Sequence, residues 1–236
     1  MRNGNGFAPC ACRDSENDRA QAAPSFRPMI RAAPSLPKFA PVRSVRAIDC
    51  EKASSVHRLT MADEPDVLTF RFGDGGGIPN HPSLPTLIYK RAGPAAQRHD
   101  PEALAKWFEQ TLAQHGWRAA WRWGVYDFPH YHSTAHELLA VYRGHASLRL
   151  GGAVGATFAV EPGDLIVLPA GTGHQNLGSS ADFHVVGAYP NGQDADLLRG
   201  DRGERPAADD RICRVPLPKA DPLTGAHGPL AKEWKL

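Results

Sequence analysis

Short runs of alternating apolar and polar residues dominate residues 61–189 and predict a protein built mainly of β-strands. Two such runs come first, at 67–72 and 85–91, with a loop rich in glycine and proline between them. Six more follow at close, regular spacing: 119–128, 137–144, 146–152, 157–163, 164–171 and 183–189. Short strands joined by tight turns are typical of a β-sandwich or a small barrel. We therefore expect an all-β domain with a single barrel over residues 61–189.

One helix is predicted between the second and third of these runs. Asp100 can cap its first turn, and Pro101 suits a first helical position. Apolar residues recur at the spacing of one helix face: Leu104, Trp107, Phe108 and Leu112. Gly116 fits the C-terminal stop. The apolar stripe should lie on the sheet, which makes this helix structural.

The two ends of the chain differ from the barrel in composition. Residues 1–60 are rich in proline, alanine, arginine and serine and show no strand or helix period, so we expect a disordered basic extension. We interpret Met61 as the domain boundary or as the true start of the protein. Acidic residues between positions 14 and 18 argue against an organelle-targeting leader. Residues 190–236 are expected to form an irregular arm that docks on the barrel or on a partner subunit.

Charge distribution and apolar run length exclude two classes of partner for the barrel. Residues 1–60 carry ten Lys and Arg against five Asp and Glu, whereas residues 61–236 carry seventeen against twenty. A mildly acidic domain argues against nucleic-acid binding, because phosphate contacts need clustered Lys and Arg. The longest apolar runs are too short to cross a bilayer, and the N-terminus lacks the apolar core of a secretory signal. We expect a cytoplasmic protein that binds neither nucleic acid nor membrane.

The candidate chemistry is concentrated in one short segment. Three histidines and a glutamate lie close together: His130, His132, His136 and Glu137. Residues two apart on a strand point to the same side, so His130 and His132 can reach one ion. His136 and Glu137 are adjacent in the following strand and point to opposite faces. Only one of these two can face inward.

A further histidine follows the strand at 164–168. Pro169, Gly171 and Gly173 permit a sharp reversal that presents His174 at the entrance of the next strand. Three neutral imidazoles and one carboxylate, with coordination positions left open, suit a divalent transition metal such as Fe, Mn, Ni, Cu or Zn. They do not suit Mg or Ca.

The spacing of these residues resembles the two motifs of the cupin superfamily. Residues 124–144 read Gly-x5-His-x-His-x4-Glu-x6-Gly, and residues 163–178 contain Gly-x5-Pro-x-Gly-x2-His. One departure exists: the second motif often ends with an asparagine four residues after the histidine, where this chain has Gly178 and places Asn176 two after it. The wider chain resembles a group of small bacterial monocupins of the YjlB type.

This resemblance implies a jelly-roll barrel, the double-stranded β-helix of germin-like and RmlC-like proteins, with one or two flanking helices. It also implies a metal held inside the barrel. The residues that match the ligand positions are His130, His132, Glu137 and His174. His136 should then point away from the metal, either outward or into the surroundings of the ligands.

Three further residues are candidates for the wall of the pocket. Phe128 shares the strand parity of the first two histidines, although aromatic core packing is the commoner role. Arg143 shares the parity of the glutamate and could bind a substrate carboxylate at the barrel mouth, against the alternative of a solvated turn residue. Asn176 could add a polar contact.

The leading functional hypothesis is a metal-dependent enzyme acting on a small organic substrate, since four protein ligands leave positions for water, dioxygen or a chelating substrate. Oxygenase, decarboxylase and isomerase reactions all occur among cupins, and analogy favours dioxygenase-like chemistry. The rival hypotheses are a non-catalytic barrel that binds or senses a small metabolite, and a metal that only stabilises the fold. Edge strands or the C-terminal arm could support a homodimer.

Overall fold

The computed structural model describes residues 65–236, so the predictions for residues 1–60 and for Met61 lie outside the described residues. The described strands form two sheets in which neighbouring strands are antiparallel. The larger sheet contains, in order, β1 (Asp66–Phe70), β2 (Thr86–Lys90), β7 (Leu165–Leu168), β4 (Glu137–Arg143), β9 (His184–Pro190) and β3 (Trp117–Trp123). The smaller sheet contains β6 (Ala156–Val160), β5 (Ala146–Leu150) and β8 (His174–Ser179).

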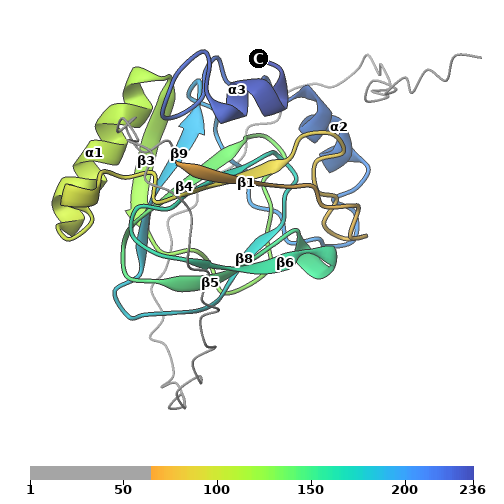
Figure 1. The fold of residues 1–236 in the computed structure, drawn as a ribbon. Helices are drawn as coiled ribbons and strands as arrows, with labels where there is room; N and C mark the ends of the chain where they lie inside the picture. The colour runs from red at the N-terminus through yellow and green to blue at the C-terminus, as the bar shows by residue number, and fades with distance from the viewer. Residues whose placement is uncertain (1–64) are drawn as a thin grey trace, which may run out of the picture. The chain divides into compact units, whose positions relative to one another are not determined.

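The two sheets face each other as a barrel (Figure 1). A backbone bridge adds one segment to the smaller sheet: the N–H of His130 donates to the carbonyl of His174 at 3.1 Å, and the reverse bond measures 2.8 Å. The smaller sheet then has four segments in the order His130 segment, β8, β5, β6. It faces four strands of the larger sheet, in the order β3, β9, β4, β7. This is the arrangement of a jelly roll. The expected fold class is therefore confirmed, with β1 and β2 extending the larger sheet.

Side chains of the larger sheet are buried on both of its faces. In β4, Leu139 packs in the barrel interior with Leu148 of the smaller sheet, whereas Leu138 packs outside with Phe108 of a covering helix. This is the alternation that the sequence predicts. It places the side chain of Glu137 on the interior face.

The predicted helix is present as α1 (Pro101–Gln114), after a short 3-10 turn η1 (Ala95–Gln97). The Asp100 carboxylate accepts hydrogen bonds from the backbone N–H groups of Glu102 and Ala103, both at 3.1 Å. Gly116 ends the helical segment with a φ of +78°, a left-handed conformation that other residues adopt only with strain. The buried residues of α1 are Leu104, Ala105, Phe108 and Leu112.

Residues 190–236, for which an irregular docking arm is expected, contain two short helices. They are α2 (Ala207–Arg214) and α3 (Pro229–Trp234). Each is too short for an apolar period to stand out in the sequence. α3 nevertheless packs on the barrel: Trp234 is 3% exposed, and its indole N–H donates to the carbonyl of Pro85 at 2.9 Å. No helix within 65–236 is long and apolar enough to cross a membrane.

Candidate metal centre

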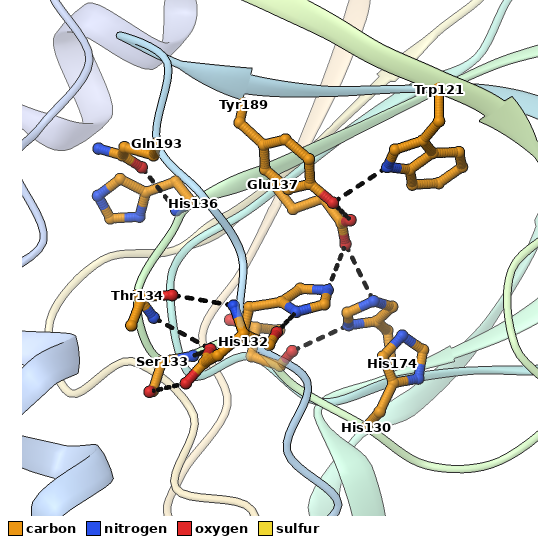
Figure 2. A network of polar contacts seen from close by, with 12 residues as sticks. Trp121, His130, His132, Ser133, Thr134, His136, Glu137, His174, Tyr189 and Gln193 are labelled. Carbon is orange, nitrogen blue, oxygen red and sulfur yellow. Dashed lines mark hydrogen bonds and ion pairs between the residues drawn. The ribbon is translucent and has the colours of Figure 1, made fainter. Parts of the chain in front are cut away.

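Three buried imidazoles meet in the barrel (Figure 2). His130 and His132 lie in the segment before β4, and His174 is the first residue of β8. One ring nitrogen from each lies within 4.8 Å of the other two. The three side chains come from two segments that the backbone bridge between residues 130 and 174 holds side by side. The structure thus brings together the three histidines that the sequence analysis selected.

The hydrogen bonds of these rings fix which nitrogen of each is free. Every Nδ1 faces a backbone carbonyl: His130 that of Phe128 and His174 that of Thr172, both at 3.1 Å, and His132 that of Asp196. A carbonyl oxygen only accepts, so each Nδ1 carries a hydrogen. In a neutral ring Nε2 then has a lone pair without a hydrogen. This is the tautomer in which an imidazole binds a metal through Nε2.

Glu137 adds a carboxylate to this group from the start of β4. Its Oε2 atom lies 3.0 Å from Nε2 of His174 and 3.4 Å from Nε2 of His132. The residue is 2% exposed, and Oε2 accepts no well-formed hydrogen bond from a residue within 65–236. A buried carboxylate oxygen without a hydrogen bond is costly. Three imidazole nitrogens and one carboxylate oxygen therefore fit a divalent transition metal.

The electrostatics of the site also favour a cation. Burial alone would raise the pKa of Glu137, but the adjacent His132 and His174 rings hold that pKa well below its usual value. Burial lowers the pKa of His132, yet the Glu137 carboxylate more than offsets this and raises it above the ordinary value. Burial lowers the pKa of His130 to about 3, so that ring is neutral at pH 7. The negative charge of Glu137 is thus compensated either by a proton on His132 or by a metal cation.

Two aromatic residues that the sequence analysis missed hold Glu137 from the opposite side (Figure 2). The hydroxyl of Tyr189 donates to Oε1 of Glu137 at 2.9 Å, and the indole N–H of Trp121 donates to that hydroxyl at 3.1 Å. An indole N–H can only donate, so the hydroxyl accepts from it and gives its own hydrogen to the carboxylate. Trp121 pairs with Gly187 across β3 and β9, where a Cβ would lie 2.1 Å from the indole. Glycine at 187 is therefore needed for Trp121 to reach Tyr189.

The loop after β9 supports the histidine segment. The carboxylate of Asp196 accepts hydrogen bonds from the backbone N–H of Ser133 at 2.6 Å and of Thr134 at 3.3 Å, and from the Ser133 hydroxyl. The carbonyl of the same residue faces Nδ1 of His132. Asp196 thus orients His132 both through its side chain and through its backbone.

His136 lies outside this group, as the sequence analysis predicted. Its Nδ1 accepts a hydrogen bond from the backbone N–H of Ala170 at 3.0 Å, so the hydrogen of the neutral ring is on Nε2. The ring packs on Trp234 of α3, with the ring centroids 4.8 Å apart. Burial lowers the pKa of His136 to about 3. This residue belongs to the core between the sheet and α3 and has the tautomer opposite to that of the three clustered rings.

Comparison with known proteins places the chain in a family. No family model matches the sequence. The uncharacterised protein YjlB of Bacillus subtilis (strain 168) is 40% identical over 171 residues, which cover 72% of this chain and 98% of the relative. The chain belongs to the YjlB family. Its barrel is of the cupin type, as the motif spacing and the strand order indicate.

Two solved structures overlap this YjlB family member in part. A DUF861 family protein from Thermotoga maritima is 21% identical and covers 33% of this chain and 83% of its own, with a TM-score of 0.24. An acireductone dioxygenase from Bacillus anthracis, with a cadmium ion in its active centre, is 20% identical and covers 58% of this chain and 79% of its own, with a TM-score of 0.28. The jelly-roll assignment rests on the strand order of the chain itself.

The three expected pocket residues of this YjlB family protein have different positions. Phe128 borders the histidines, since its ring centroid lies 5.6 Å from that of His130. The amide of Asn176 is used within β8, where it donates to Ser179 at 3.1 Å and accepts from the N–H of Gly178 at 2.9 Å. Asn176 therefore shapes the strand end.

Arg143 is not brought to the site, and its position fits the alternative of a solvated residue instead of a carboxylate-binding arginine. It lies at the other end of β4 from Glu137, about 20 Å away at about 3.3 Å per residue. Its exposed guanidinium is 3.4 Å from the carboxylate of Asp182. A register shift between Val141 and Arg143 also interrupts the strand parity on which the prediction relied.

Tyr189, Trp121 and Asp196 were missed for different reasons. Strand alternation could have placed Tyr189 on the interior face. Tyr189 lies two residues after Gly187 and four after Val185 in β9, and residues an even number apart on a strand share a face. The contacts of Trp121 and Asp196 join segments far apart in the chain, and no local pattern reports such contacts.

Proposed function

We propose that this protein binds a divalent transition metal inside its barrel and uses the ion to act on a small organic molecule. The proposed ligands are His130, His132, His174 and Glu137. The observation that carries the proposal is the shared orientation of the three rings, whose Nδ1 atoms donate to backbone carbonyls, so that Nε2 of each neutral ring has a lone pair for a metal. Iron, manganese, nickel, copper and zinc all suit this donor set.

The residues around the site support a role beyond holding an ion. When bound, such an ion supplies a Lewis acid or, for a redox-active metal, a site for dioxygen chemistry. The ligand side chains are almost completely buried, and the barrel interior beside Glu137 is apolar, with Leu139 and Leu168 among its residues. Surroundings of this kind exclude water and strengthen electrostatic interactions with a bound molecule. Dioxygenase-like, decarboxylase and isomerase reactions use these features, and dioxygenase-like chemistry is the first to test.

The visible spectrum of the cobalt(II) form of the full chain tests this function. Chelating small acids and phenols should change the cobalt spectrum, because four protein ligands leave open positions on the ion. A compound that changes the spectrum would then be incubated with the iron form while oxygen consumption and products are followed. A cobalt spectrum that no added molecule changes would mean a purely structural metal. Spectral changes without turnover of any compound would favour the binding or sensing role instead.

A further inference from the structure

An arginine lies directly across from the first histidine of the metal centre. The segment that follows β9 runs antiparallel to the histidine segment, with the N–H of Tyr131 donating to the carbonyl of Leu198 at 2.9 Å and the reverse bond at 3.0 Å. In the same antiparallel register, the pair of opposite residues next to Tyr131 and Leu198 is His130 and Arg199. Residues directly opposite each other in an antiparallel pair share a face. Arg199 is therefore on the same face of these two segments as the ligand histidines.

The side chain of Arg199 is held by an aromatic ring and not by an acid. Its guanidinium carbon lies 4.0 Å from the ring centroid of Phe128. Among the residues at 65–236, no carboxylate lies at ion-pair distance from Arg199, whereas Arg122 and Arg205 each contact two. Stacking on a ring restricts the guanidinium but leaves its N–H edge available to an anion.

Large apolar side chains are exposed around this arginine. Tyr126 is 50% exposed although its ring stacks on Phe128, with centroids 4.8 Å apart, and lies 5.2 Å from His130. Leu197, two residues before Arg199 in the chain, is 46% exposed. Exposed apolar residues beside a buried polar group are typical of a ligand-binding surface.

A groove beside the arginine also borders one residue of the proposed site. An open groove of about 470 Å³ has both Arg199 and His174 among its lining residues. Both residues thus border the same space. The groove and the stacked cation thus occur together beside the site.

We propose that Arg199 binds a carboxylate of the molecule on which the metal centre acts, a proposal that rests on the function proposed above. Tyr126 and Phe128 would contact the apolar part of that molecule. The planar guanidinium matches a carboxylate in a two-point contact, which orients the bound acid as well as attracting it. The substrate class is therefore a small organic acid with a metal-chelating group and an apolar part.

A family of hydroxamates tests this assignment on the cobalt(II) protein. Acetohydroxamate chelates without a negative carboxylate, whereas malonic, succinic and glutaric monohydroxamates add a carboxylate at increasing distance from the same chelating group. Dissociation constants would be measured by spectral titration. In the wild-type protein at least one acid should bind roughly tenfold more tightly than acetohydroxamate. Arg199→Gln should abolish that difference, and Arg199→Lys should restore part of it.

Two controls separate the arginine from the metal. Arg143→Gln, which removes a cation at the far end of β4, should leave every affinity unchanged. Metal content is measured on every sample. Full metal content with equal affinities for all four hydroxamates, or a preference that survives in Arg199→Gln, would overturn the role of Arg199 alone. A wild-type protein that takes up no metal would overturn the proposed function and this assignment together.

Discussion

At the scale of single residues, the direction of a hydrogen bond separates a metal ligand from a structural histidine. The clustered rings donate from Nδ1 to carbonyls, whereas the Nδ1 atom of His136 accepts from the N–H of Ala170. Only the first arrangement leaves a lone pair on Nε2 of a neutral ring. A buried histidine can therefore stand next to a ligand in the sequence and still be unable to bind the ion through Nε2.

The hydrogen bond from Tyr189 to Glu137 gives a prediction at this scale. Tyr189→Phe should lower the affinity for cobalt or zinc about 10-fold to 100-fold, as loss of an outer contact to a ligand typically does. The phenyl ring keeps the packing, so the protein should still fold. Tyr142→Phe, near the far end of β4, is the matched control and should bind metal like the wild type. Equal affinities of both variants in a metal titration would show that Tyr189 does not orient Glu137.

At the scale of elements, the loop between β9 and α2 is part of the proposed metal centre. Asp196 in this loop fixes the turn at Ser133 and Thr134, and its carbonyl fixes the tautomer of His132. Arg211 of α2 also donates to the Ser133 hydroxyl, at 2.7 Å. The barrel strands position two histidine-bearing segments, and the following loop then orients one of the rings.

Removal of the Asp196 carboxylate should therefore weaken metal binding as well as the fold. Asp196→Ala should lower the free energy of unfolding by about 1–3 kcal/mol, because buried donors lose their acceptor. It should also weaken metal binding by about tenfold. Asp194→Ala is the control from the same loop, since the contact of Asp194 with Thr134 is made by its backbone carbonyl. Denaturant unfolding and metal titration measure both effects, and a loss of the same size in the two variants would contradict this role.

At the scale of the whole molecule, the sequence predicts what depends on local periodicity. The period of two in β4 placed Glu137 inside and His136 outside, and the Asp100 cap with the apolar stripe located α1. Both patterns are set by neighbouring residues and hold wherever the element is regular. Arg143 shows the limit, because one register shift in β4 cancels the parity beyond it.

Features that depend on distant pairing could not be predicted in this way. α3 is six residues long, and its position follows from Trp234, whose partner Pro85 lies far away in the sequence. The hydrogen bonds of Trp121 to Tyr189 and of Asp196 to Ser133 likewise close long loops. Single-sequence patterns therefore located the candidate ligands but not the residues that orient them.

The metal content of matched histidine variants tests the central claim most directly. Elemental analysis would be made on the full chain, purified without a metal-affinity tag. We predict about one transition-metal ion per chain in the wild type. His132→Ala and Glu137→Ala should lose most of it, whereas His136→Ala should keep it despite lower stability. Undiminished metal in a folded His132→Ala protein, or its loss from a folded His136→Ala protein, would contradict the account.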